Sequence, residues 1–136
     1  MAVQKGRDLL IRIDDGTGAF VAVAGLRARR LSLDAGTVDV THAESAGRWR
    51  ELLADAGPRR ASVTGAGVFR DEASDALLRA LFFAGGVRAF QIVIPGLGQL
   101  QGPFQIAGLD YRGDHAGELA FEIALESAGE LAFAPL

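Results

Sequence analysis

Hydrophobic and polar residues alternate over several short stretches of the chain. Leu9, Ile11 and Ile13 open this pattern, and Asp-Asp-Gly-Thr-Gly at 14–18 predicts a hairpin turn before a partner strand near Phe20. Further strands are predicted at 26–33, 37–41, 61–69, 87–95 and 99–111. Successive side chains of a strand point to opposite faces, so this pattern is typical of sheets with one buried face.

Two of these strands contain residues that disturb a regular sheet. Pro103 cannot donate a ladder hydrogen bond, which favours a place at an edge or an end of the sheet. Gly65 and Gly67 lie where core side chains are expected, and they indicate a bulge or a close approach of another backbone segment.

The last predicted strand has the most regular alternation. Leu119, Phe121, Ile123 and Leu125 share its core face, whereas Glu118, Glu122 and Glu126, with Ala120 and Ala124, share the other. We call these three glutamates the acidic row. They are expected to stand about 6 to 7 Å apart, where like charges repel. A solvated outer face accounts for the row as well as a functional surface does.

One segment has helical periodicity. Asp71 is the expected N-cap of a helix over 72–84, and Gly85-Gly86 is the expected stop. The apolar stripe expected to pack on the sheet consists of Ala73, Ala76, Leu77, Ala80, Leu81 and Ala84, widened by Leu78 and Phe82. One helix among about seven strands predicts a mainly β fold, a β-sandwich or barrel with a flanking helix.

The segment 42–60 interrupts the strand pattern. Trp49, Leu52, Leu53 and Ala56 have the spacing of one or two helical turns, ended by Gly57-Pro58. A connection of this length with exposed apolar side chains is typical of a lid or a contact surface. Trp and Arg are enriched in protein interfaces, and Trp49 stands between two arginines. The alternative is that Trp49 folds back on its own core.

Composition narrows the function. The 136 residues, 49% hydrophobic and 23% charged, predict a single folded domain over 1–136. A net charge of −3 argues against a nucleic-acid binder that works through bulk positive charge. The absence of cysteine excludes disulfides and thiolate sites. No apolar run approaches the roughly 20 residues of a membrane span, so we expect synthesis in the cytoplasm and no membrane insertion.

Few residues are candidates for a catalytic, metal or phosphate site. His42 and His115 lie in expected loops without the spacing of a metal or catalytic motif, and Ser45 near His42 lacks a nucleophile elbow. Asp14 to Gly18 resembles half of a calcium loop, but a hairpin turn fits it better. The basic cluster Arg27, Arg29 and Arg30 is more typical of a salt-bridged face than of a phosphate site. We therefore expect no enzyme activity, no metal and no cofactor.

Four sequence blocks resemble one known family. They are KGRDLLIRID at 5–14, VDVTHAESAGRWRELLADAG at 38–57, VTGAGVFRDEASD at 63–75 and ALESAGELAF at 124–133. Together they resemble the major tail tube protein of long-tailed phages, in the version found in bacterial gene transfer agents. The resemblance implies a β-sandwich-like subunit with one flanking helix. It also implies hexameric rings whose stacked copies form a structural tube, the conduit for DNA in a virion or gene transfer agent particle.

The resemblance assigns the extended loop 34–60 to contacts with a neighbouring subunit or ring. The expected interface residues are Val38, Val40, Trp49, Arg50, Leu52 and Leu53. Six copies at −3 each give a ring a formal charge of −18, which would repel phosphates, so DNA is expected to pass without specific binding. Under this hypothesis the acidic row lines the lumen, and other tail proteins meet the tube ends. The alternatives are a small-ligand-binding β-barrel and a hydrolase of unrecognised type.

Overall fold

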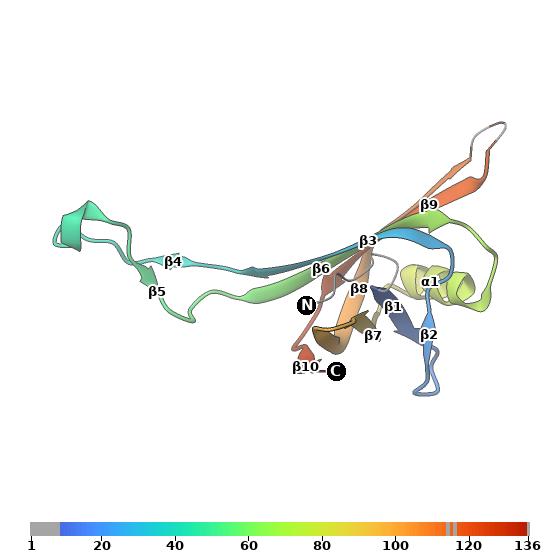
Figure 1. Ribbon diagram of the computed structural model, residues 1–136, viewed down its shortest axis with the longest axis horizontal. Helices are drawn as coiled ribbons and strands as arrows, with labels where there is room; N and C mark the ends of the chain where they lie inside the picture. Colours follow the sequence, from blue (N-terminus) through green and yellow to red (C-terminus); the bar gives the residue numbers. More distant parts are fainter. Residues whose placement is uncertain (1–8, 114, 116, 136) are drawn as a thin grey trace.

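The computed structural model describes residues 9–113, 115 and 117–135, and within them the chain forms ten strands, one α-helix and a short 3-10 helix (Figure 1). In chain order these are β1 (Leu10–Asp14), β2 (Phe20–Ala22), β3 (Leu26–Ala35), β4 (Val38–Asp39), the 3-10 helix η2 (Ala46–Arg48), β5 (Leu52–Leu53), β6 (Arg59–Val68), α1 (Ala73–Ala84), β7 (Val87–Ile94), β8 (Gly98–Gly113), β9 (Leu119–Ser127) and β10 (Ala132–Ala134). The prediction of a mainly β fold with one helix is confirmed.

Eight strands form one antiparallel sheet in the order β2-β1-β7-β8-β9-β6-β3, with β10 paired to β8. The expected hairpin joins β1 to β2, and its turn is held by Asp14 and Asp15, whose carboxylates accept backbone hydrogen bonds from Gly16 and Thr17. The sheet is strongly twisted, with α1 beside it (Figure 1). β2 and β3 are its two ends, so each has one edge without a partner strand in the described sheet.

The core lies on one face of this sheet. Alternate residues of β1 and β9 enter it, with Ile11, Ile13 and Ile123 buried as predicted. The prediction is wrong for Leu119, which is 41% exposed at the start of β9, where its partner Gly113 has no side chain to cover it. Phe90, Phe104 and Phe121 are each at most 2% exposed, and the rings of Phe90 and Phe104 meet edge to face at 6.0 Å. These rings fill the interior that a ligand-binding barrel would keep open.

The glycines of β6 allow the close approach predicted for them. A Cβ on Gly67 would lie 2.0 Å from the Gly25 carbonyl oxygen, and one on Gly65 would lie 2.9 Å from a Leu26 methyl carbon. The pairing of β3 with β6 is irregular at this point, between Leu26 and Ala28. A larger residue at 67 would push the two backbones apart.

Pro103 lies inside β8, between β7 and the strands on its other side. The neighbour on that side changes here, because β10 pairs with residues 99–101 of β8 and β9 pairs from Phe104 onward. The Pro103 carbonyl accepts a hydrogen bond of 2.9 Å from the Ala128 N–H, just after β9 ends. The prediction of an edge or an end is therefore wrong for Pro103, which lies inside β8 and pairs with Ala89 of β7. Its missing N–H is tolerated because, on the other side of β8, it falls between the residues paired with β10 and those paired with β9.

The helix begins one residue later than predicted. Glu72, not Asp71, is the N-cap, and it forms a capping box with Asp75, whose carboxylate accepts the Glu72 N–H at 2.9 Å. Asp71 has a φ of 54° and precedes the helix as a turn residue. Gly85 ends the helix in the left-handed conformation, which confirms the predicted stop.

The predicted packing stripe of α1 is wrong by part of a turn. The buried positions are Ser74, Asp75, Leu78 and Leu81, whereas Ala73, Ala76, Ala80 and Ala84 are exposed and Leu77 is half-buried. Leu78 and Leu81 fill the core on this face, and the Ser74 hydroxyl beside them accepts a hydrogen bond of 3.1 Å from the Ala24 N–H, which ties the helix to the turn between β2 and β3. The inner face thus includes polar residues, which a search for apolar periodicity leaves out.

Candidate subunit interface

A two-stranded arm projects from the sheet over residues 34–60 (Figure 1). β3 and β6 pair as far as Ala35 and Arg59, and the Gly36 N–H then donates to the Pro58 carbonyl at 2.7 Å. Beyond it, β4 and β5 pair in a separate two-stranded sheet. The arm is therefore a nearly continuous antiparallel ribbon, which gives the extended loop expected at 34–60 a defined direction.

The helical turns predicted from Trp49, Leu52 and Leu53 are wrong. Leu52 and Leu53 form β5 and pair with Asp39 and Val38. The only helical element of the arm is η2 at Ala46–Arg48, which bends sharply because Gly47 has a φ of 59°. A helix would leave the backbone groups of β4 without partners, whereas the ribbon satisfies both segments.

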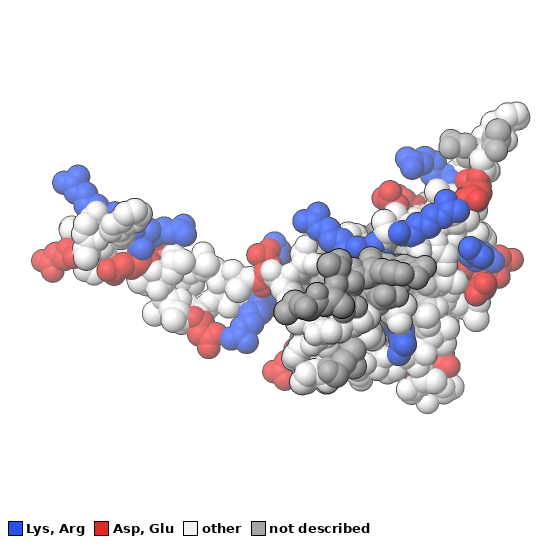
Figure 2. Space-filling view, viewed as in Figure 1, with Lys and Arg blue, Asp and Glu red and all other residues white. Residues whose placement is uncertain are grey.

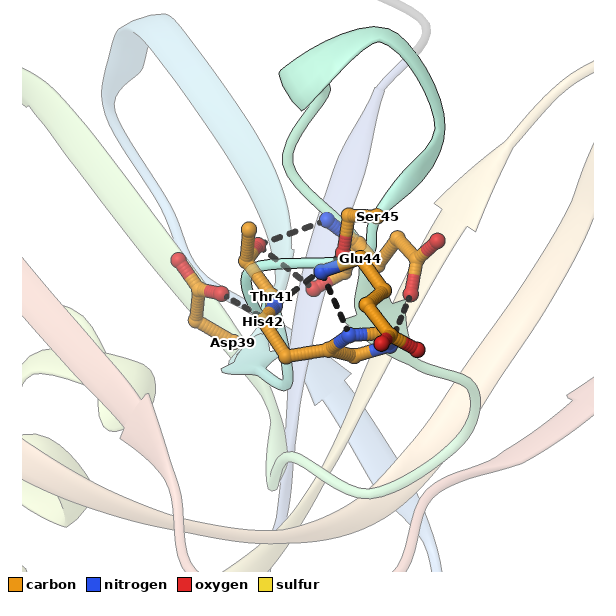
Figure 3. A network of polar contacts seen from close by, with 6 residues as sticks. Asp39, Thr41, His42, Glu44 and Ser45 are labelled. Carbon is orange, nitrogen blue, oxygen red and sulfur yellow. Dashed lines mark hydrogen bonds and ion pairs between the residues drawn. The ribbon is translucent and has the colours of Figure 1, made fainter.

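The arm tip is held in shape by a polar network (Figure 3). The Ser45 hydroxyl accepts the His42 N–H at 3.0 Å, and the Thr41 hydroxyl accepts the Glu51 N–H at 2.8 Å. The Thr41 side chain and backbone N–H lower the pKa of Asp39 below its usual value, because both donate hydrogen bonds that stabilise the charged carboxylate. These contacts order a segment that has almost no core of its own.

The six residues expected at a subunit interface all lie exposed on this arm. The exposed fractions are 40% for Val38, 40% for Val40, 78% for Trp49, 41% for Leu52 and 53% for Leu53, and Arg50 is also exposed. We call this set the arm patch. Trp49 packs against Gly47, where an added Cβ would stand 3.0 Å from its ring. The alternative that Trp49 folds back on its own core is therefore wrong for this subunit.

The arm does not assemble a catalytic pair. The Ser45 hydroxyl bonds to the backbone of His42, and the His42 ring accepts the Glu44 N–H at Nδ1 and faces Glu51 at 3.7 Å. His115 is exposed, away from the arm in the turn between β8 and β9. Within the described residues, no three metal-ligating side chains gather and no helix is long and apolar enough to cross a membrane.

The acidic row lies on the sheet face opposite the core, but its geometry differs from the prediction. Its members are four residues apart, which is about 13 Å in a strand rather than the 6 to 7 Å expected. Arg27 pairs with Glu118 at 3.0 Å, and the Ser62 hydroxyl donates to Glu126 at 2.8 Å. Glu122 borders a hollow of about 420 Å³ that Arg30 and Asp110 also line.

Charges of both signs are mixed on the visible surface (Figure 2). Besides the pair of Arg27 with Glu118, Arg60 pairs with Asp34 at 3.2 Å near the root of the arm. These exposed pairs contribute little to stability, at most about 1 kcal/mol each. The salt-bridged face expected for the basic cluster is confirmed at Arg27, and the acidic row is partly neutralised by its neighbours.

A comparison of this chain with models of known protein families gives a match. The family model of phage tail tube proteins matches residues 3–133. The chain belongs to the phage tail tube protein family. None of the curated proteins with which it was compared matches it.

Solved structures agree with this membership. This tail tube protein is 53% identical to a chain in the tail of an empty gene transfer agent (GTA) particle with C6 symmetry, with a TM-score of 0.94 and coverage of 97% of this chain and 99% of that one. A chain in the virion of a native GTA particle is 52% identical, with a TM-score of 0.92 and the same coverage. The SPP1 tail tube, 14% identical over 97% of this chain and 79% of that one, shares the fold at a TM-score of 0.71.

Proposed function

We propose that this tail tube protein assembles into six-membered rings that stack to form the tube of a GTA or phage tail. The observation that carries the proposal is the 53% identity, over nearly the full length of both chains, to a protein in a C6-symmetric GTA tail. The role is structural, and the packed core and solvated histidines of the described residues favour it over ligand binding or catalysis.

The two ends of the sheet supply the contacts within a ring. The outer edges of β2 and β3 have no partner strand in the described sheet, although exposed edges of this kind promote aggregation. Repeating one heterologous contact around a closed ring covers these edges with neighbouring copies. Ring closure thus gives the free backbone groups partners and stops further lateral growth.

The arm patch supplies a contact between subunits. Its apolar side chains are exposed on a hydrogen-bonded ribbon, so ordering them on binding costs less than it would for a free loop. Trp and Arg are the residues that most often dominate binding energy, and here Arg48, Trp49 and Arg50 are consecutive. We expect these residues to join one subunit to the next.

The sheet face that carries the acidic row lines the lumen in this proposal. It combines small and polar side chains, among them Thr64, Ala66 and Ala124, with Arg30 and Arg112. These arginines lie beside Asp110 and Glu122, so the face presents charges of both signs and no purely basic surface to a passing polymer. The ring charge of −18 adds a general repulsion of phosphates. DNA would then move through the tube without specific binding.

The location of the subunit and its partners in the particle follow from the same proposal. The subunit would be made in the bacterial cytoplasm and end in the tail of a particle, where other tail proteins meet the two ends of the tube. The chain's assembly with itself is the part that purified protein can test directly.

The test is assembly of the purified subunit, followed by light scattering and negative-stain microscopy. The wild-type chain should form rings about six subunits in size and tubes. The double variant Trp49→Ala, Leu52→Asp should stay folded by circular dichroism but form no tubes. The matched control, Trp49→Phe with Leu52→Ile, keeps an aromatic and an aliphatic side chain at these positions and should assemble. A wild-type chain that stays monomeric under all assembly conditions would refute the proposal.

A further inference from the structure

The helix α1 is apolar on two faces, although it packs against the subunit with only one. Leu78 and Leu81 are buried at 1% and 5% exposure, and with Ser74 they define the inner face. The opposite face consists of Ala73, Ala76, Ala80, Phe83 and Ala84, all exposed. We call these five residues the helix patch. The exposed Arg79 lies one turn before Phe82 and Phe83 on the helix surface, but these five residues still form an exposed apolar face, and such a face lacks its partner in the isolated subunit.

Phe83 is the largest side chain of the helix patch and lies at its C-terminal end. It is 81% exposed, more than any other large apolar side chain of the described residues, and its ring meets that of Phe82 edge to face at 5.6 Å. The alanines beside it leave a shallow surface that a bulky side chain can approach closely. Folding of the subunit does not require an aromatic residue here, because its ring is mostly in solvent.

The position of α1 in the subunit indicates which segment covers the patch. The arm lies at one end of the long axis of the molecule and α1 near the other (Figure 1). When copies repeat head to tail, opposite ends of successive copies meet, and a contact of this heterologous kind extends into a filament. The arm tip of one copy then reaches the α1 end of the next.

The two surfaces are also chemically matched. The arm tip presents Trp49 with Arg48 and Arg50 beside it, all exposed. The helix patch presents Phe83 and alanines, with exposed Asp71 and Glu72 just before its N-terminal end and the exposed Arg79 one turn from Phe83. The arginines of the arm tip are thus attracted to the Asp71 end of the patch and repelled by Arg79. Apolar groups can therefore meet apolar groups while the arginines approach carboxylates, an arrangement that selects one docking orientation.

We propose that the helix patch is the docking surface for the arm tip of a second copy of this chain, supplied by the neighbouring ring. The proposal rests on the stacking of rings in the proposed function and names the two surfaces that hold the stack together. It assigns the apolar outer face of α1 a role in binding between subunits.

Photo-crosslinking tests this contact in assembled tubes. Phe83 is replaced by p-benzoylphenylalanine, an aromatic residue that on illumination bonds to whatever covers it, and the cross-linked peptides are mapped by mass spectrometry. We expect covalent dimers and longer ladders in which position 83 is joined to residues 42–53 of another copy. The same probe at Leu97, which is 56% exposed in the turn between β7 and β8, is the control and should give no such peptide.

A second variant measures the contact without a probe. Phe83→Glu should leave a folded subunit and abolish long tubes under conditions where the wild-type chain assembles. Tubes of the p-benzoylphenylalanine variant in which position 83 cross-links to another segment, or to nothing, would overturn the docking assignment and leave the proposed function standing. Absence of wild-type rings and tubes would refute the proposed function itself, so the two failures are distinguishable. Normal tubes from Phe83→Glu would also overturn the assignment.

Discussion

Truncating a buried leucine of α1 measures how firmly the helix is packed on the sheet. Leu81 is 5% exposed and belongs to the main hydrophobic core. Leu81→Ala removes three carbon atoms, and at about 0.8 kcal/mol for each buried methylene the transfer loss is about 2.4 kcal/mol. The cavity left behind adds to this, because the capping box and the Ser74 hydrogen bond limit how far the helix can relax. We expect a total loss of about 3 kcal/mol.

Urea denaturation of the unassembled subunit, followed by circular dichroism, is the appropriate assay. With a slope of about 2 kcal/mol per molar urea, the expected loss lowers the midpoint by about 1.5 M. The matched control on the same helix is Phe83→Ala, which removes a larger side chain from an 81% exposed position and should change stability by less than about 0.5 kcal/mol. Equal midpoint shifts for the two variants would refute the assignment of inner and outer faces.

Two further predictions concern the sheet. Changing all three members of the acidic row to lysine should leave rings intact but slow DNA delivery at low salt, with the defect easing as salt rises, because phosphate attraction is screened. Normal delivery at low salt would place the row outside the lumen. Gly67→Ala should destabilise the subunit by about 1 to 3 kcal/mol or more in the same urea assay, since the new Cβ meets the Gly25 backbone. Gly108→Ala, where an added Cβ meets nothing within 4 Å, should be tolerated.

The strands were predictable where burial is one-sided and the turn chemistry is local. Phe121, Ile123 and Leu125 are buried on one face of β9, as their alternation required. The turn at 14–18 also forms as predicted, because Asp14 and Asp15 bond to backbone groups only a few residues away. Neither feature depends on a distant part of the chain, and both could therefore be predicted from the sequence.

The arm was predictable as an exposed segment but not as a ribbon, and its contact with other subunits stays a prediction. Leu52 and Leu53 fit helical spacing with Trp49, yet their backbones pair with Asp39 and Val38, more than ten residues earlier. Helical spacing compares only residues that are close in the sequence, whereas the pairing of β5 depends on β4, which lies on the other side of the arm tip. The predicted distance within the acidic row was wrong for a simpler reason. Residues two apart on one face stand about 6 to 7 Å apart, but Ala120 and Ala124 lie between the glutamates and double this distance.

For α1, the sequence alone could not separate the apolar residues that are buried within the subunit from those that are exposed. The driving force that buries an apolar side chain is proportional to the area removed from water, and it is the same whether the covering atoms belong to the same chain or to another. Ala76, Ala80 and Leu81 therefore contribute alike to a periodic pattern, although Leu81 is buried within the subunit and the two alanines are exposed. Separating the two classes needs the tertiary contacts of the inner face, here the burial of Leu78 and Leu81 and the Ser74 contact with Ala24. Once these contacts are known, the apolar residues that remain exposed on α1 and on the arm are the ones that we propose to meet other copies.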